Sequence, residues 1–282
     1  MHFANVPLDR PRIMGVVNVT PDSFSDGGER FDHARAIEDG RRMRAEGADI
    51  LDIGGESTRP GAAMVEVEEE LRRVLPVVRA LARDGACISI DTRHAAVMRA
   101  AIAEGAAIVN DVSALRDDPA ALPLVAASRT PVILMHRRQA AFGQYSGPRY
   151  GEVVADVKAF LQERIAACVA AGIEPAAIAL DPGIGFGKGV DDNLRLVLGL
   201  PRLADLGHPI LVGASRKSFI GRLTTVEEPR ERLGGSLAVA VEAARRGAAI
   251  LRVHDVAATR QALQLAHAFN ILDRGGSAFP AR

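Results

Sequence analysis

The sequence predicts one α/β domain, a closed (β/α)8 TIM barrel, from three observations. Short apolar runs alternate with amphipathic segments along the chain, which is typical of a parallel sheet covered by helices. About eight such runs occur in the 282 residues, and a barrel of this kind takes roughly 250 residues. No change of composition separates two halves, so we expect a single domain. An open, doubly wound sheet is the alternative architecture.

A repeated Gly-Ala motif precedes four of the apolar runs. Its glycines are Gly47, Gly85, Gly105 and Gly247. Each follows a helical pattern, where a left-handed glycine commonly ends a helix. The apolar residues after each glycine suit a strand that is buried on both faces. The predicted strands are residues 13–17, 50–51, 88–90, 108–109, 132–135, 178–180, 210–212 and 250–251.

Two segments between the strands show helical periodicity, over residues 67–81 and 153–169. We expect their apolar stripes to face the sheet and not a partner protein. The stripes are Val67, Leu71, Val74, Leu75, Val78 and Leu81, and Val153, Val157, Phe160, Leu161, Ile165 and Val169.

The domain is predicted to have a lead-in of residues 1–12, a barrel of residues 13–274 and a flexible tail of residues 275–282.

The composition restricts the class of partner. Hydrophobic residues make up 48% of the chain, and 35 basic residues balance 35 acidic ones. A net charge of zero gives no electrostatic reason to expect nucleic acid or an anionic membrane. Cys87 and Cys168 are both expected in the core of a protein from a reducing compartment. No apolar run approaches the roughly 20 residues of a membrane helix, so we expect a cytoplasmic location.

Polar residues follow the predicted strands. In a (β/α)8 barrel the carboxyl ends of the strands share one mouth, where chemistry collects. A ring of charged and amide groups is costly to assemble there unless it binds something polar, although any single member is also explained as a cap or turn residue. The set comprises Asn18, Asp52, Glu56, Asp91, Asn110, Asp111, His136, Asp181, Ser215, Lys217, Arg252 and His254.

The segment IALDPGIGFGK, residues 178–188, is the most informative of these strand ends. Asp181 is predicted at the end of a buried strand beneath a glycine-rich lip, and the alternative is an ordinary turn aspartate. Pro182 and Gly189 break the Walker phosphate-loop pattern, and Lys188 breaks the Rossmann pattern. The polar loops of residues 20–30 and 56–63 are predicted to cover the mouth.

Seven strand-end motifs in register resemble the dihydropteroate synthase family. They extend over nearly the whole chain, and their order makes the resemblance specific although each is weak alone. The motifs are NVTPDSFS at residues 18–25, GGESTRPG at 54–61, SIDT at 89–92, NDVS at 110–113, DPGIGFGK at 181–188, SRKS at 215–218 and RVHD at 252–255.

The resemblance implies a barrel that joins 6-hydroxymethyl-7,8-dihydropterin diphosphate to para-aminobenzoate in folate synthesis, with Mg2+ as cofactor and departure of diphosphate before amine attack. It also implies a homodimer and a sulfonamide target. The catalytic residues would be Asp91, Lys217, Arg252 and His254. The pterin contacts would be Asp91, Asn110, Met135, Asp181, Phe186, Lys217 and Arg252. The para-aminobenzoate contacts would be Phe24, Thr58, Arg59, Pro60, Phe186, Lys217 and Ser218. The diphosphate contacts would be Asn18, Thr58, Arg59, Arg252 and His254, with Asn18 on the metal.

Three alternatives remain open from the sequence. They are a paralogue that keeps only the pterin site, a pterin-dependent methyltransferase domain, and a non-enzymatic barrel. The presence of Phe24, Thr58, Arg59 and Pro60 argues against the first, and the RVH match argues against the second. Residues 137–150 depart from the family pattern, so the shape of the fifth loop is not predicted.

Overall fold

The computed structural model describes residues 1–20, 29–56, 64–138, 150–273 and 275. Its main sheet has eight parallel strands in the order β8-β7-β6-β5-β4-β3-β10-β9. A parallel bridge between Leu180 and Ile210 joins the two edge strands, so the sheet curls into a barrel and the open-sheet alternative is wrong. The strands are β3 (Arg12–Asn18), β4 (Ile50–Gly54), β5 (Ile88–Asp91), β6 (Ile108–Asp111), β7 (Val132–Met135), β8 (Ile178–Asp181), β9 (Leu211–Val212) and β10 (Ile250–Val253).

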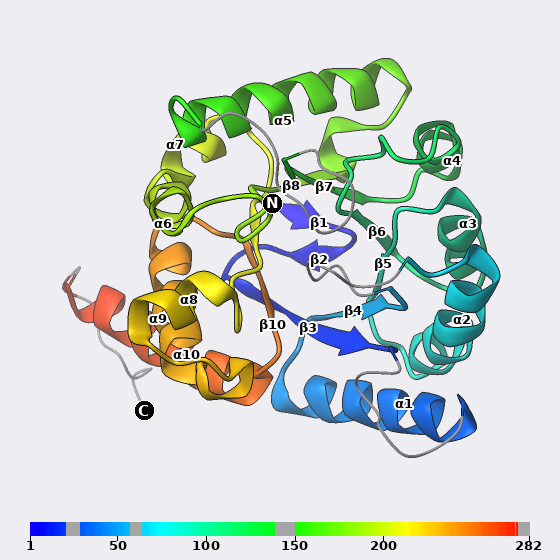
Figure 1. Ribbon diagram of the computed structural model, residues 1–282, viewed down its shortest axis with the longest axis horizontal. Helices are drawn as coiled ribbons and strands as arrows, with labels where there is room; N and C mark the ends of the chain where they lie inside the picture. Colours follow the sequence, from blue (N-terminus) through cyan, green and yellow to red (C-terminus); the bar gives the residue numbers. More distant parts are fainter. Residues whose placement is uncertain (21–28, 57–63, 139–149, 274, 276–282) are drawn as a thin grey trace.

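Helices surround the strands on all sides (Figure 1). The four glycines of the repeated motif have φ angles of 107°, 75°, 106° and 95°, which confirms their predicted place after helix ends. The helices are α1 (Glu29–Glu46), α2 (Val67–Arg83), α3 (Ala95–Ala103), α4 (Ala121–Ser128), α5 (Val153–Ala170), α6 (Val190–Leu198), α7 (Leu200–Ala204), α8 (Ser218–Thr224), α9 (Leu233–Arg245) and α10 (Val256–Asp273), with short 3-10 turns at Pro175–Ala177 and Pro229–Glu231.

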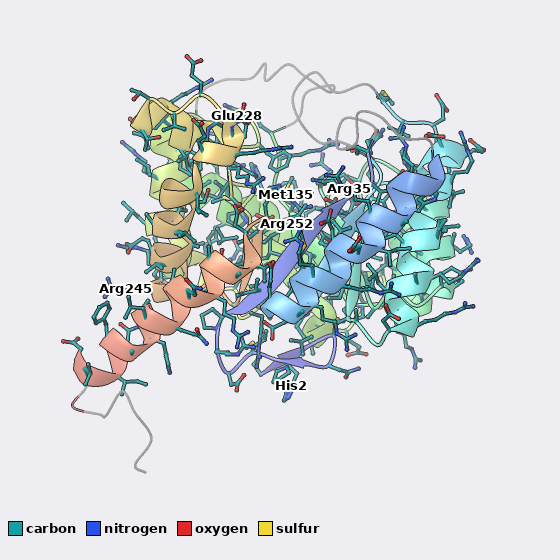
Figure 2. All side chains as sticks on the ribbon, turned by 90° about the horizontal axis from the view of Figure 1, so that it is seen from below. His2, Arg35, Met135, Glu228, Arg245 and Arg252 are labelled. Carbon is teal, nitrogen blue, oxygen red and sulfur yellow. The ribbon has the colours of Figure 1, made fainter. Side chains whose placement is uncertain are left out.

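The amino end of the barrel is filled by apolar side chains. Phe3 is 1% exposed and packs there from the hairpin of β1 (His2–Phe3) and β2 (Val6–Pro7). Figure 2 shows this hairpin, marked by His2, below the barrel and away from Met135 and Arg252. The predicted lead-in therefore contributes to the core. The remaining buried members of this layer are Met14, Ile50, Ile108, Ile133, Ala179, Leu211 and Ile250.

Polar residues form the next inward-facing layer. Side chains alternate between the faces of a strand, so the residue two positions after an inward apolar residue also points inward. This places Asp52 after Ile50 on β4 and Asp181 after Ala179 on β8. The same step leads to Asn110 and Arg252 on β6 and β10, and to the apolar Met135 on β7. The sheet thus carries an apolar floor and a polar mouth.

Several predicted details are corrected. Helix α1 begins at Glu29, inside the segment expected to be the first cover loop. Val169, assigned to an apolar stripe, is 42% exposed, whereas the adjacent Cys168 is fully buried. Cys87 is only half-buried. None of the helices in the described part of the chain combines the length and apolar character that crossing a bilayer requires.

Candidate active site

Arg252 lies at the centre of the mouth between two carboxylates. Its Nε donates to Oδ2 of Asp52 over 2.6 Å, and a terminal nitrogen donates to Oδ2 of Asp91 over 2.7 Å. The amide of Asn110 also donates to Asp52, at 3.2 and 3.4 Å from the two carboxylate oxygens. Gly213 lies beside this arginine, and a Cβ there would make ordinary van der Waals contact with the Arg252 Cβ at 3.6 Å. Four strands thus contribute to one hydrogen-bonded cluster.

The charges of this cluster interact strongly because little of the cluster is exposed to solvent. Asp52 has a fully buried side chain, and that of Asp91 is 11% exposed. Burial raises the pKa of Asp91, while the guanidinium of Arg252 opposes that rise. For Arg252, burial disfavours the charged form, but Asp52 and Asp91 outweigh it and raise its pKa. Arg252 engages Oδ2 of Asp91, and no hydrogen bond among the described residues reaches its Oδ1.

Asp181 and Lys217 are two further ionisable groups of the mouth, and they interact through their charges. Burial raises the pKa of Asp181, and Lys217 opposes that rise. Burial lowers the pKa of Lys217 to about 8, with Asp181 acting in the opposite direction. Asp181 Oδ1 accepts a hydrogen bond from the Gly183 backbone N–H over 2.7 Å, which fixes the carboxylate at the base of the lip.

The glycine-rich loop of residues 182–189, called the lip, packs against Lys217. The ammonium donates to the carbonyl of Ile184 and lies 4.2 Å from the centre of the Phe186 ring. Gly185 has φ of 83°, and a Cβ there would come within 2.6 Å of the Lys217 Cδ. A larger residue at 185 would therefore displace the lysine.

The other predicted site residues lie around these pairs. Asn18 ends β3, and the register runs from Asn18 to Gly54, from Gly54 to Asp91 and from Asp91 to Asn110. Met135 is 3% exposed and is paired in register with Asp181. Helix α8 begins at Ser218.

His254 follows β10, and its Nδ1 lies 3.1 Å from the Ser215 hydroxyl. That hydroxyl also accepts the His254 backbone N–H over 3.3 Å. The loops after β9 and β10 are thus tied together at His254, one of the predicted diphosphate contacts. Four predicted contacts, Phe24, Thr58, Arg59 and Pro60, lie outside the described residues.

Two members of the predicted polar ring do not face the mouth. Asp111 accepts the backbone N–H groups of Ser113 and Leu115 over 2.7 and 2.8 Å, which shapes the loop after β6. His136 is 7% exposed with its ring edge-on to Phe160 of α5, and burial lowers its pKa to about 3. Both follow an inward residue by one position, so strand alternation turns them toward the helices.

Asp52 belongs to the predicted polar ring, but sequence reasoning gave it no specific role, although the structure places it against Arg252. It stands in the middle of β4 and not after it. The only signal was a carboxylate inside an otherwise apolar strand, which is costly unless it is paired.

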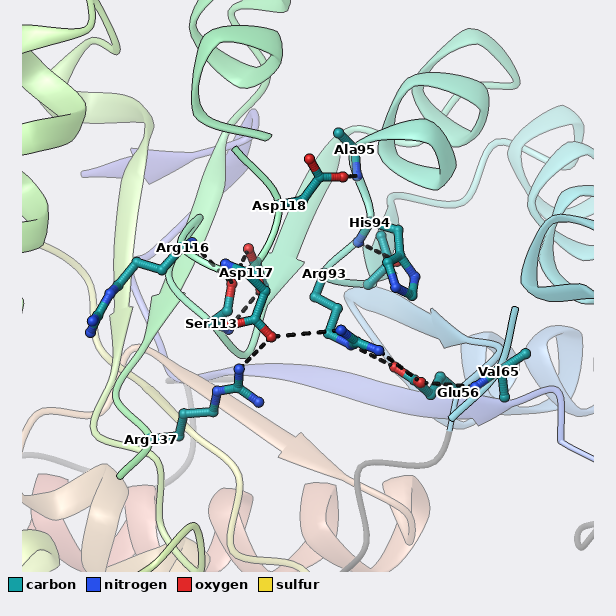
Figure 3. Close-up of polar contacts among 12 residues, drawn as sticks. Glu56, Val65, Arg93, His94, Ala95, Ser113, Arg116, Asp117, Asp118 and Arg137 are labelled. Carbon is teal, nitrogen blue, oxygen red and sulfur yellow. Dashed lines mark hydrogen bonds and ion pairs between the residues drawn. The ribbon is translucent and has the colours of Figure 1, made fainter. Parts of the chain in front are cut away.

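A second polar network connects the chain segments that follow the strands at the carboxyl end of the barrel (Figure 3). Arg93 reaches both oxygens of Glu56, at 3.1 and 3.3 Å, and lies 3.8 Å from Asp117. Arg137 pairs with the same Asp117. Glu56 also accepts the Val65 backbone N–H over 3.2 Å. The network connects the chain after β4, β5, β6 and β7, so we assign Glu56 a structural role.

Comparison with known proteins identifies the family. A family profile described as pterin binding enzyme matches residues 14–254. The dihydropteroate synthase of Neisseria meningitidis serogroup C is 48% identical over 269 residues, which cover 94% of this chain and 95% of that protein. The chain belongs to the dihydropteroate synthase family.

Solved dihydropteroate synthases share the fold. The enzyme of Xanthomonas albilineans with 4-aminobenzoic acid is 54% identical, with a TM-score of 0.88, over 93% of this chain and 94% of that chain. The same enzyme in complex with 7,8-dihydropteroate is 51% identical, with a TM-score of 0.86, over 94% of this chain and 95% of that chain. The barrel and the resemblance to the dihydropteroate synthase family are thereby confirmed.

Proposed function

We propose that this chain condenses 6-hydroxymethyl-7,8-dihydropterin diphosphate with para-aminobenzoate to give 7,8-dihydropteroate and diphosphate. The observation that carries the proposal is the wall of half-buried Asp91 and buried Asn110 and Asp181, which faces the cations Lys217 and Arg252. A flat heterocycle with several N–H donors and one carbonyl needs acceptors on one side and a cation on the other.

Asp181 is suited to the aminopyrimidinone edge of the pterin. Two adjacent N–H donors match the two oxygens of a carboxylate, and the charge strengthens both bonds. Its Oδ1 keeps a lone pair after accepting from Gly183. Asn110 offers both a donor and an acceptor to the ring nitrogens. Lys217 would donate to the ring oxygen and N5, and Met135 would pack on the ring face.

Departure of diphosphate before amine attack fits these groups. Electron density from the pterin ring delocalises the positive charge that develops on the methylene carbon when the leaving group departs. The carboxylate of Asp91 would stabilise that cation, and Arg252 and His254 would stabilise the departing anion. The amine of para-aminobenzoate then forms the new carbon–nitrogen bond and releases a proton.

Asn18 is the proposed protein ligand of a magnesium ion. No hydrogen bond holds its side chain within the described residues, and its amide supplies the oxygen ligand that Mg2+ prefers. The described residues contain no cluster of three metal-binding side chains, which suits an ion whose other ligands are diphosphate and water. Bound Mg2+ would neutralise charge on the leaving diphosphate.

The para-aminobenzoate slot would be formed by Phe186, Lys217 and Ser218 from the described part of the chain. Ser218 is exposed at the start of α8, where its hydroxyl and backbone N–H can meet a carboxylate. Phe24, Thr58, Arg59 and Pro60 complete the proposed slot, and Thr58 and Arg59 also serve the diphosphate.

A product assay tests the proposal. The purified chain is mixed with the dihydropterin diphosphate, para-aminobenzoate and Mg2+, and dihydropteroate is measured by chromatography. Formation of dihydropteroate together with free diphosphate supports the synthase. A pterin-dependent methyltransferase or a paralogue with only the pterin site would bind pterin but release no diphosphate.

We also propose that the chain forms a homodimer through α10. Leu265, Phe269 and Leu272 are 59%, 56% and 54% exposed on this helix. Their spacing of four and three residues places them on one face, and such an exposed apolar stripe is typical of a protein interface. Sedimentation at micromolar concentration should give the mass of two chains, and Phe269→Asp should give one.

A further inference from the structure

Lys188 is enclosed by backbone carbonyls at the edge of the proposed pterin site. Its Nζ lies 2.8 Å from the carbonyl oxygen of Gly183, 3.1 Å from that of Phe186 and 3.2 Å from that of His136. An ammonium group has three N–H donors, so the three carbonyls match its full donor capacity. Burial lowers the pKa of Lys188 to about 7, with Asp181 acting in the opposite direction.

These three carbonyls belong to two separate segments. Gly183 and Phe186 lie in the lip of residues 182–189, whereas His136 directly follows β7. At the junction the backbones almost touch, since a Cβ on Gly183, whose φ is 68°, would lie 1.8 Å from the His136 carbonyl oxygen. The ammonium of Lys188 therefore bridges two chain segments 52 residues apart.

Asn193, in the first turn of α6, holds the lip from its outer end. Its Oδ1 accepts the Gly185 N–H over 2.6 Å, and its Nδ2 donates to the Gly189 carbonyl over 2.7 Å. The lip in turn supplies the Ile184 carbonyl and the Phe186 ring that surround Lys217. A shift of the lip would therefore move the groups around Lys217.

The composition of the chain independently singles out this lysine. Of 35 lysine and arginine residues, only Lys158, Lys188 and Lys217 are lysines. Arginine thus serves nearly everywhere that a positive charge suffices. A planar guanidinium is broader than an ammonium and presents its donors in a fixed fork. It therefore cannot donate three short hydrogen bonds from a single nitrogen. Lysine at 188 therefore indicates a need for a compact, three-donor cation.

We propose that Lys188 is a positioning residue of the pterin site. Its ammonium acts as a clamp that holds the lip against the end of β7, and it thereby fixes the Ile184 carbonyl and the Phe186 ring that surround Lys217. The inference rests on the proposed function for the identity of the ligand. It assigns Lys188 no contact with the reacting atoms.

The scarcity of lysine makes the ammonium groups directly observable. With 15N-lysine in the full-length protein at pH 6, side-chain ammonium signals arise from three residues only. Slowly exchanging signals are expected from the two enclosed groups, Lys188 and Lys217, and one of them should vanish in Lys188→Arg. Loss of neither signal, or a Lys188 ammonium that exchanges as fast as that of the surface residue Lys158, would overturn the clamp.

Binding measurements then separate positioning from general damage. Lys188→Arg is compared with Lys158→Arg, in which the altered lysine pairs with the exposed Asp205. Calorimetry with 6-hydroxymethylpterin should show about a tenfold loss of affinity in Lys188→Arg, the equivalent of roughly one broken hydrogen bond, and less than a twofold change in Lys158→Arg. Affinity for Mg2+-diphosphate, whose proposed ligands lie off the lip, should be unchanged in both.

Two results would contradict the positioning role of Lys188. One is an equal loss of affinity for pterin and for diphosphate in a folded variant, and the other is an unchanged pterin affinity. If Lys188→Arg does not fold, Lys188→Met is measured in the same way. Failure of the unaltered protein to bind the pterin would refute the proposed function, whereas the ammonium signals would still decide whether the clamp exists.

Discussion

Arg252 and Asp52 form an ion pair of 2.6 Å across 200 residues of sequence. The carboxylate is fully buried, and the guanidinium is 22% exposed. Because Asp91 holds the same guanidinium, two negative groups share one cation in the wall of the mouth. The pair therefore sets both the charge balance and the orientation of the arginine proposed to face the leaving diphosphate.

Replacing Asp52 with Asn should destabilise the fold. The substitution keeps shape but leaves Arg252 with one carboxylate partner, and breaking a buried pair costs about 3–5 kcal/mol. We expect a loss near the lower end, since Asp91 remains, measured as the free energy of unfolding in urea. Asp205→Asn, at an exposed pair, serves as the control and should leave stability unchanged. An Asp52→Asn protein as stable as its parent would show that the pair contributes nothing.

Replacing Asp181 with Asn should abolish tight pterin binding. The backbone N–H of Gly183 will hold the amide oxygen of the new side chain, so the NH2 group is turned toward the ring donors. One charge-assisted bond is lost and a donor is left unsatisfied, each about 1.5–3 kcal/mol, which predicts an affinity loss on the order of 10²–10³-fold or more. Titration of a pterin analogue measures it, with circular dichroism to verify folding. Unchanged affinity would favour a turn aspartate.

Pterin affinity should fall as the pH rises through 8. Burial lowers the pKa of Lys217 to about 8, below its ordinary value of 10.5, so the charged donor is present below pH 8 and is lost above it. In Lys217→Arg the side chain stays charged at every accessible pH, and the decline assigned to this residue should disappear, whatever the affinity at pH 7. Lys188 titrates in both proteins and cancels in the comparison. Identical pH profiles would exclude Lys217 as the cause.

Removal of magnesium should stop turnover. Excess chelator is expected to suppress dihydropteroate formation, and Asn18→Ala should lower it about tenfold or more while pterin affinity stays within twofold, because Asn18 is proposed to touch only metal and diphosphate. Steady-state rates and pterin calorimetry provide the two measurements. Full activity in excess chelator would rule out the metal.

Much of the fold was predictable because its signals are local. The apolar runs fix where strands form, and the glycines after helical patterns fix where helices end, as the positive φ of Gly47 and Gly247 confirms. The resemblance of the strand-end motifs to one family was also readable, because those motifs occur in order along the chain. The predicted places of Asp91, Asn110 and Asp181 at strand ends followed from the same pattern.

What only the tertiary structure decided is which strand-end residues face one another. Asn110 and Asp111 are neighbours in sequence, yet strand alternation turns one toward Asp52 and the other toward the loop at Ser113. Parallel pairing of β10 with β3, which in turn pairs with β4, places Arg252 against Asp52, and the fold of the lip brings Lys188 to the His136 carbonyl. A sequence specifies residue types and local periodicity, whereas register and closure are set by the packing of the whole barrel, and these contacts depend on both.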